Sequence, residues 1–307
     1  MATASNFNVG GATAQIVDQS ARDNAQRAVN SAEYARQAET DTYVGQSLAS
    51  AFSGEIANYA NAWAWLRARA RAGNFAGLRV KDYIDVTLTN GNSVRYRIGA
   101  IDPYYLCGDA SKGHHVVMVP SAPVAVTDAE YQTSSGQYIY WNKENTNQGT
   151  ADNPHPYLVS NLHKWEIEVY YQQLPQMVRD CILNQRVLLE TRYSASGALT
   201  ASTSWGWADL GPVWSPSEME VYGCCIWGTP GYSIGFDCQF EIFKQTKDRI
   251  QGSRFRWWLR SVSGLSSSYV CCVNGDASAY YPAPAYAWVR PLALLPRRVT
   301  PEAVYFA

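Results

Sequence analysis

The feature that most constrains this chain is an abrupt change of composition near its C-terminal end. Two motifs rich in tryptophan and arginine, Trp257-Trp258-Leu259-Arg260-Ser261 and Trp288-Val289-Arg290-Pro291, enclose a different kind of segment, residues 262–287. That segment is mainly Ser, Ala, Tyr, Val, Cys, Pro and Gly, with Asp276 as its single charged residue. Tyrosine among small residues is typical of adaptable binding loops, because it gives large contact area at low entropic cost. Composition leaves two interpretations open: a ligand-contact surface, or a sheet with small-residue turns.

The two motifs and the Gly275-Asp276 turn resemble the C-terminal signature of phage and prophage proteins with a C-type-lectin-like fold. The resemblance is to the retroelement-diversified, major tropism determinant-like type, and it covers roughly residues 155–295, about half of the chain. Upstream motifs occur in the order such proteins show: Ser160-Asn161-Leu162-His163-Lys164-Trp165, Leu174-Pro175, Trp214-Ser215-Pro216-Ser217-Glu218 and Glu220-Val221-Tyr222-Gly223.

The resemblance implies a C-type-lectin-like mixed α+β domain, 76–307, and helical periodicity upstream predicts an attachment and oligomerisation segment over 1–75, so the expected fold class is α+β. It implies a phage virion protein of receptor-binding or tail-fibre type, made in the bacterial cytoplasm, that binds a host-cell surface protein or glycan. Other virion proteins and further copies of the chain are expected partners, with a trimer favoured by analogy. Trp257, Trp258 and Arg260 are expected to be scaffold, and Arg260 or Arg290 to hold loop carbonyls or a carboxylate.

Residues 262–287 are the expected ligand-presenting segment. Diversified members vary a residue set that excludes Trp, Met, Lys, Glu and Gln, and these five types are absent between residues 262 and 287. This match favours a diversifiable surface. The predicted ligand contacts are Ser266, Ser268, Tyr269, Cys271, Asn274, Ser278, Tyr280, Tyr281, Pro284 and Tyr286.

Two other functions remain open. The chain could be a head or tail decoration protein without a ligand, or a cell-surface glycan hydrolase, because paired carboxylates can come from distant parts of a sequence. The four histidines stand beside no recognisable nucleophile elbow and no phosphate loop is present, so we expect no enzyme. Sulfatase activators share the lectin-like fold and use paired cysteines. Cys271-Cys272 would be the candidates here, but we expect those residues to be buried or variable.

Composition restricts the partners further. A net charge of −1 offers no electrostatic basis for nucleic-acid binding. No apolar run approaches the length of a membrane span, and the N-terminus lacks the features of a signal peptide. The acidic loop and Trp-Asn-Asp triplet of calcium-dependent lectins are missing, so ligand binding should need no metal and no cofactor. Seven cysteines without zinc spacing indicate a reduced protein, although one disulfide between distant cysteines remains open.

Periodicity predicts the elements in outline. Residues 12–44 read as a long helix with an alanine seam at heptad spacing, and 46–72 as a bulkier amphipathic helix that forms core or an oligomer seam. Period-two alternation around Asn90-Gly91 predicts a β-hairpin over 79–101. The remaining expectations are loops at 131–156 and 194–213, helix over 158–192, a helix start at Ser215-Pro216-Ser217-Glu218, a short helix near 240–250, and paired strands ending at Arg290-Pro291.

Overall fold

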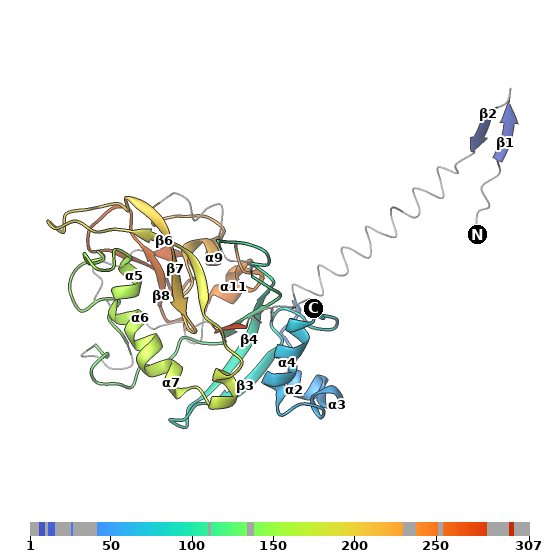
Figure 1. Ribbon diagram of the computed structural model, residues 1–307, viewed down its shortest axis with the longest axis horizontal. Helices are drawn as coiled ribbons and strands as arrows, with labels where there is room; N and C mark the ends of the chain where they lie inside the picture. The colour runs from blue at the N-terminus through green and yellow to red at the C-terminus, as the bar shows by residue number, and fades with distance from the viewer. Residues whose placement is uncertain are drawn as a thin grey trace, which may run out of the picture. The chain divides into compact units, whose positions relative to one another are not determined.

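The computed structural model describes residues 6–9, 12–15, 26, 42–109, 112–133, 138–229, 238–250, 254–280 and 295–297. The chain divides into two compact units, Met1–Val44 and Gly45–Ala307. In the first unit, β1 (Asn6–Val9) and β2 (Ala12–Gln15) form an antiparallel hairpin (Figure 1). The helix predicted over 12–44 is therefore wrong at its start. Gln26 and Thr42 have helical backbone, and the other residues of the alanine seam lie outside the described residues.

The larger unit begins with three short helices in place of the single helix predicted over 46–72. These are α2 (Leu48–Ala51), α3 (Ser53–Ile56) and α4 (Ala62–Arg71). The division follows local chemistry, because Asn61 adopts extended backbone and its side chain accepts a hydrogen bond from the Ala64 amide at 2.9 Å, which starts a new helix. Trp63, Trp65 and Leu66 of α4 are buried in the unit's own core. This segment belongs to the larger unit, so the expected boundary at residue 75 does not separate two bodies.

An antiparallel four-stranded sheet of order β11-β5-β4-β3 follows. Its strands are β3 (Tyr83–Thr87), β4 (Ser93–Ile101), β5 (Val116–Pro120) and β11 (Leu295–Arg297). The predicted hairpin is confirmed, with Gly91 in the turn at φ 86°. Burial alternates along β3, whereas every residue of β5 is buried. The sheet therefore has a half-solvated edge at β3 and an interior strand at β5.

A run of short helices packs beside a second antiparallel ladder (Figure 1). The helices are α5 (Pro156–Val159), α6 (Asn161–Trp165), the π-helix η1 (Glu166–Tyr170), α7 (Tyr171–Gln173) and α8 (Gln176–Arg179). The ladder pairs β6 (Gln185–Thr191) with β7 (Ser204–Gly211). Both the helix predicted through residue 192 and the loop predicted over 194–213 are corrected here. A short apolar run such as Val187-Leu188-Leu189 has no period that separates strand from helix, and its partner strand decided the outcome.

The last elements form a three-stranded antiparallel sheet of order β10-β9-β8, preceded by short helical turns. They are α9 (Glu218–Tyr222), the 3-10 turn η2 (Glu241–Phe243), α11 (Thr246–Arg249), β8 (Trp257–Val262), β9 (Val270–Val273) and β10 (Ala279–Tyr280). Ser217 caps α9 in a reciprocal capping box with Glu220, so the predicted helix start is confirmed, with Glu218, two residues after Pro216, as the first helical residue. The fold is mixed α+β with antiparallel sheets, as the sequence predicted.

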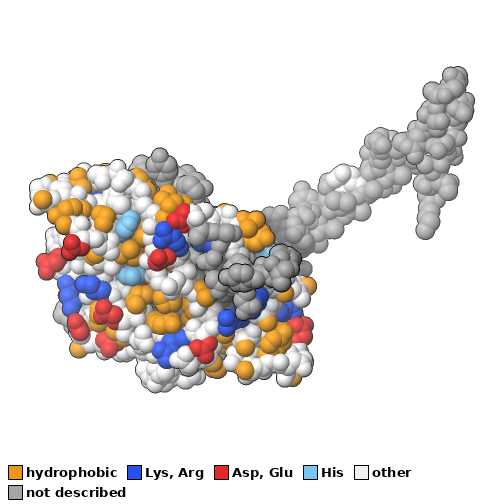
Figure 2. All heavy atoms as spheres, in the orientation of Figure 1, with side chains coloured by type: hydrophobic (Ala, Val, Ile, Leu, Met, Phe, Trp, Pro, Cys, Tyr) orange, Lys and Arg blue, Asp and Glu red, His pale blue; other side chains and the backbone are white. Residues whose placement is uncertain are grey.

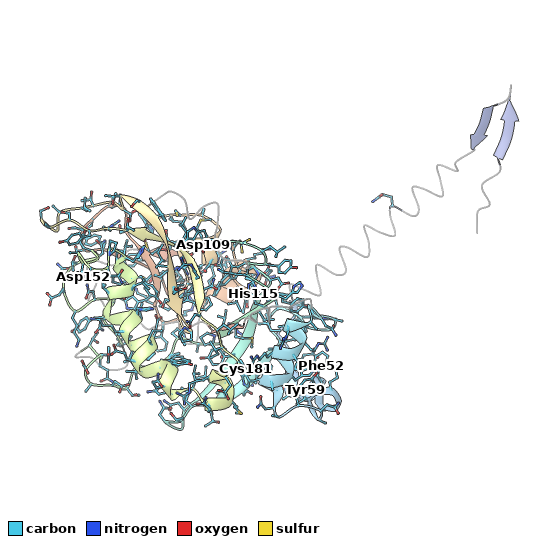
Figure 3. All side chains as sticks on the ribbon, in the orientation of Figure 1. Phe52, Tyr59, Asp109, His115, Asp152 and Cys181 are labelled. Atoms are coloured by element: carbon cyan, nitrogen blue, oxygen red, sulfur yellow. The ribbon has the colours of Figure 1, made fainter. Side chains whose placement is uncertain are left out.

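The core is dominated by large aromatic side chains. Of the tryptophans that the structure describes, seven are almost completely buried: Trp63, Trp65, Trp141, Trp165, Trp214, Trp257 and Trp258. Among the side chains labelled in Figure 3, Cys181 belongs to this interior, whereas Tyr59 lies at the periphery beside α3 and is 43 % exposed. On the face shown in Figure 2, basic and acidic side chains are interspersed, which agrees with the net charge of −1. Within the described residues, no helix is long and apolar enough to cross a membrane.

Candidate functional site

The structure separates the predicted contact residues into surface and interior. Ser266, Ser268 and Tyr269 are half-buried in the β8–β9 loop, and Asn274 is half-buried in the β9–β10 turn. Ser278 is exposed in the same turn, and Tyr280 on β10 is 38 % exposed. Tyr281, Pro284 and Tyr286 lie outside the described residues, as does the motif Trp288-Val289-Arg290-Pro291.

The prediction that Cys271 contacts a ligand is wrong, because its side chain is completely buried. β9 is the middle strand of the three-stranded sheet and all four of its residues are buried, so both of its faces belong to the core. Burial raises the pKa of the Cys271 thiol well above its usual value, and the nearby Glu218 and Glu190 carboxylates raise it further. Cys271 and Cys272 therefore have the character of inert core residues, and all seven cysteines are free thiols.

The tryptophans of the first motif form part of a rigid frame, as expected. The Trp258 indole N–H donates to the Ile139 carbonyl at 2.9 Å, and the Trp257 indole N–H donates to the Arg249 carbonyl at 3.1 Å. In return, the Trp141 indole N–H donates to the Leu259 carbonyl at 3.0 Å. These bonds fix β8 to the distant segment 139–141 and to the nearby residue Arg249, and they leave no indole donor of the three unsatisfied.

Arg260 holds both a carboxylate and a carbonyl, as the resemblance implied. Its guanidinium pairs closely with the buried Glu220 carboxylate and donates to the Ser215 carbonyl at 3.3 Å. Glu220 also accepts from the Ser217 amide at 2.8 Å and from the Tyr104 hydroxyl. Arg260 thereby ties β8 to the start of α9 through a buried, well-satisfied ion pair.

The β8–β9 loop is held by two buried side chains from elsewhere in the chain. The Asn147 amide group donates to the Ser266 carbonyl at 2.9 Å and to the Tyr269 carbonyl at 2.5 Å. The Arg192 guanidinium donates to the Ser263 carbonyl at 2.8 Å and to the Ser266 carbonyl at 3.2 Å. All four bonds end on backbone oxygens of the loop, so these two side chains hold its backbone directly.

A second loop, Ile226-Trp227-Gly228, lies beside the first and is fixed in a similar way. The buried Glu218 carboxylate accepts from all three of its backbone amides, at 2.8 to 3.2 Å. The Gly264 amide then donates to the Trp227 carbonyl at 2.8 Å, and the Trp227 indole N–H donates to the Ala279 carbonyl at 3.2 Å. This loop therefore connects the β8–β9 loop to β10.

Together these segments present what we call the loop surface: residues 226–228, 264–269 and 274–280. Its most exposed large side chains are Leu265 at 62 %, Ile226 at 44 % and Tyr280 at 38 %. The Arg256 guanidinium lies 4.8 Å from the centre of the Tyr280 ring, and its Nε donates to Asn274 Oδ1 at 2.8 Å. Sequence reasoning missed Ile226 and Leu265. The isolated leucine between Gly264 and a run of serines was the available signal for Leu265.

The Gly275-Asp276 turn is confirmed as a structural feature. Asp276 Oδ1 accepts from the Ser278 hydroxyl at 2.5 Å and from the Ser278 amide at 3.0 Å, and these donors lower the pKa of the exposed carboxyl. A side chain at Gly275 would begin 2.1 Å from the Arg254 carbonyl oxygen, so only glycine fits there. Across the described ranges, no group of three or more His, Cys, Asp or Glu side chains could hold a metal ion.

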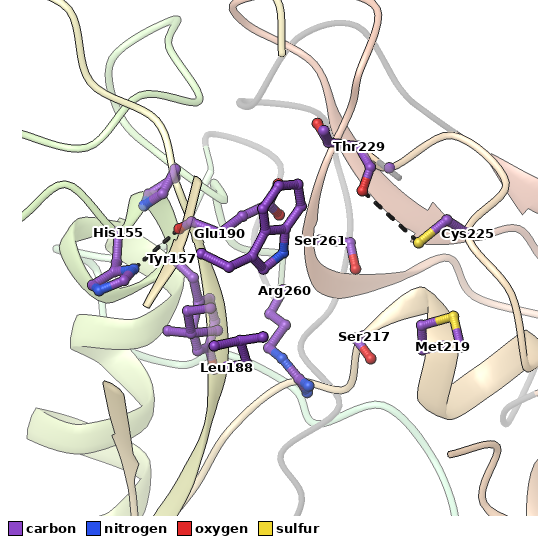
Figure 4. A pocket seen from close by; sticks show the side chains of 14 residues that line it. His155, Tyr157, Leu188, Glu190, Ser217, Met219, Cys225, Thr229, Arg260 and Ser261 are labelled. Atoms are coloured by element: carbon purple, nitrogen blue, oxygen red, sulfur yellow. Dashed lines mark hydrogen bonds between the residues drawn. The ribbon is translucent and has the colours of Figure 1, made fainter. Parts of the chain in front are cut away.

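A cavity of about 40 Å³ lies beside the loop surface, between the β6–β7 ladder and the start of α9 (Figure 4). His155, Tyr157, Leu188 and Glu190 line one side, and Met219, Cys225 and Thr229 line the other, with Arg260 and Ser261 between them. Its remaining lining residues are Pro156, Leu189, Trp205, Ser217 and Gly228. The volume holds about three water-sized groups and is far below the roughly 300 Å³ at which small-molecule sites begin.

Comparison with known proteins places the loop surface and the cavity inside one family. Residues 130–297 match the model of a domain of unknown function (DUF6273), and the chain belongs to that family. No curated protein and no solved structure matches the chain. The matched region contains β6 to β11 and Asn147, Arg192 and Glu218, which hold the loops.

Proposed function

We propose that this chain is a ligand-binding phage virion protein of the receptor-binding or tail-fibre type, with a C-type-lectin-like domain. The observation that carries the proposal is the loop surface, whose backbone is fixed from below by Asn147, Arg192 and Glu218 while its large side chains remain exposed. A surface ordered before binding loses less conformational entropy when a ligand arrives. Its ligand would be a host-cell surface protein or glycan, held by aromatic contact and hydrogen bonds without a metal.

The motifs that carry the lectin-like resemblance meet in space, which supports the proposed fold. Arg260 of the tryptophan motif bonds to Ser215 and Glu220, which come from two upstream motifs. Glu218 donates its backbone N–H to the Ser261 hydroxyl at 3.0 Å. Residues that recur together in a fold family are expected to lie together in its frame. An experimental structure with a different strand order in the C-terminal sheet would remove this support.

The carboxylates near the cavity favour binding over hydrolysis. Glu190 accepts from the Val262 amide at 3.1 Å and the Ser202 hydroxyl at 2.5 Å, and Glu218 is occupied by three loop amides. A glycosidase needs one carboxyl group to donate a proton and the other to face a water or the sugar. Here both carboxylates hold loops, and the cavity is too small for a sugar ring.

The binding proposal is tested with fluorescently labelled protein and a panel of bacterial cells. We expect saturable binding to some cells, lost in the triple variant Ile226→Ser, Leu265→Ser, Tyr280→Ser. The matched control is Leu106→Ser with Met177→Ser, which removes apolar side chains that are 66 % and 46 % exposed outside the loop surface. Protease treatment of the cells would abolish binding to a protein, and periodate treatment would abolish binding to a glycan. Equal binding of the triple variant and the control variant to the cells would contradict the proposal.

The proposed virion role also implies multiple copies and a variable surface. A homo-oligomer, with a trimer expected, would convert weak single-site affinity into useful avidity. Light scattering of the purified chain measures the number of copies. A near-copy of the codons for residues 262–287 beside a reverse transcriptase gene would support diversification, whereas a decoration protein would show Tyr280 covered by its neighbours in the particle.

A further inference from the structure

The cavity beside the loop surface combines groups that recognise a cation. Glu190 and Trp205 are direct partners across the β6–β7 ladder, so their side chains leave the same face of the ladder. Both residues line the cavity, and Tyr157 contributes a second aromatic side chain. An aromatic face attracts an ammonium group through the ring quadrupole, and a carboxylate beside it supplies the counter-charge.

The guanidinium groups of Arg192 and Arg260 lie near the cavity and are already hydrogen-bonded. Arg260 is committed to Glu220 and the Ser215 carbonyl. The hydrogen bonds of Arg192 end on loop carbonyls and hydroxyl groups. Within the part of the chain that the structure describes, no basic side chain lies within ion-pair distance of Glu190. The Arg192 guanidinium acts on the Glu190 carboxylate electrostatically without forming an ion pair with it.

Glu190 retains capacity for another donor. Its two oxygens accept one hydrogen bond each, from the Val262 amide and the Ser202 hydroxyl, whereas a carboxylate offers about four acceptor positions. Burial raises the pKa of the Glu190 carboxyl, and the neighbouring Arg192 opposes this without cancelling it. The ionised form of a buried carboxylate with free acceptor positions is stabilised when a cation binds beside it.

The size of the cavity limits that cation. A volume of about 40 Å³ accommodates about three water-sized groups. A two-carbon chain ending in an ammonium group matches this number of groups, whereas guanidinium and quaternary ammonium groups contain more heavy atoms than the volume accommodates. Trp205, Cys225, Gly228 and Ser261 are half-buried, so the cavity has an approach from the surface, and Gly228 also belongs to the loop surface.

We propose that this cavity binds a primary ammonium group at the end of a short methylene chain, with Glu190 as its counter-ion and Trp205 and Tyr157 as aromatic walls. The inference rests on the proposed function in one respect: the ammonium group would anchor a ligand that also contacts the loop surface. A terminal amine of this kind would enter alone, and the rest of the ligand would remain outside.

The test uses the full chain and small amines as probes, followed by nuclear magnetic resonance of the backbone amides and tryptophan indoles. Ethylammonium chloride should shift the Trp205 indole and the Thr229 amide saturably, with a dissociation constant in the millimolar range expected for so small a ligand. Ethanol, which has the same number of heavy atoms but no charge, and tetramethylammonium, which is larger than the cavity volume allows, should each bind at least about tenfold more weakly. Sodium chloride at the same concentration controls for ionic strength.

Glu190→Gln should weaken ethylammonium binding by at least about tenfold, while Glu144→Gln, which changes an exposed carboxylate, should leave it unchanged. Trp205→Leu is a second variant that removes an aromatic wall and keeps Glu190. Equal affinity for ethanol and ethylammonium, or full affinity in folded Glu190→Gln, would overturn the proposal. Because these probes need no host cell, failure here is distinguishable from failure of the cell-binding experiment, which depends on Ile226, Leu265 and Tyr280.

Discussion

Single buried charges hold this protein's loops and strands in place. Glu218, Glu220, Arg192 and Arg260 are all nearly or completely buried, and each is hydrogen-bonded to another segment of the chain. Removing one partner of such a pair leaves the other charge buried without compensation, which costs far more than loss of a surface pair.

Arg260→Met should destabilise the fold by about 3–5 kcal/mol, because Glu220 would then remain buried without its cation. The control is Arg95→Met, which breaks an exposed pair with Asp85 and should cost less than about 1 kcal/mol. Urea denaturation measures both. The double variant Arg260→Met, Glu220→Gln should recover part of the loss, and a cost for Arg260→Met no larger than for Arg95→Met would contradict the prediction.

The buried carboxyl group of Glu166 should make the stability of the fold depend on pH. Burial raises the pKa of its carboxyl to about 8, against the opposing effects of the Tyr157 and Ser215 hydroxyl groups and Arg260. A carboxyl group whose folded pKa exceeds its unfolded value binds its proton more tightly when folded. Its stabilising contribution is therefore complete below pH 4.5 and is lost as the pH rises to about 8. The change is on the order of a few kcal/mol.

Glu166→Gln mimics the protonated carboxyl group and should remove this pH dependence. We expect the free energy of unfolding to fall between pH 5 and pH 8.5 more steeply in the natural protein than in Glu166→Gln. Other titrating groups contribute equally to both proteins, so the difference isolates Glu166. Parallel curves for the two proteins would show that the carboxyl group is ionised in the fold at neutral pH.

At the scale of elements, the β8–β9 loop illustrates how a segment without regular structure can be rigid. Its carbonyl groups receive donors from Asn147 and Arg192, and neither donor lies within the loop or its flanking strands. The adjoining strand β9 is core on both faces, although its Ser/Cys/Tyr-rich surroundings resemble a surface. Whether a residue here is in the core or on the contact surface therefore depends on the element it belongs to, and not on its residue type.

Asn147→Ala should loosen this loop and cost about 1–3 kcal/mol, because the carbonyls of Ser266 and Tyr269 lose their buried donor. Hydrogen exchange measured by mass spectrometry should accelerate over residues 263–270 and remain unchanged in β4 and β5. Leu265→Ser, which changes an exposed side chain of the same loop, should alter stability by less than about 0.5 kcal/mol. Equal protection of the loop in both variants would show that Asn147 does not hold it.

For the whole molecule, the division between Val44 and Gly45 separates two units. Removal of residues 1–44 should leave the melting temperature of the remaining chain within a few degrees of the full chain, because the buried core residues that the structure describes all belong to the larger unit. Under the proposed role of the N-terminal segment, the shortened chain should be a monomer. Calorimetry and light scattering measure the two outcomes. A large drop in melting temperature would show that residues 1–44 complete the core.

The sequence by itself determined the mixed α+β class, the β3–β4 hairpin, the α9 start and the scaffold roles of Trp257, Trp258 and Arg260. These features depend on neighbouring residues, on turn and capping chemistry, or on side chains too large to stay in solvent. Tertiary structure alone decided that β6 and β7 pair as strands, that Cys271 is core, and that Asn147, Arg192 and Glu218 hold the loops. Those outcomes depend on partners distant in the chain. Residue type and local spacing do not determine which distant carbonyl group a buried donor will bond to.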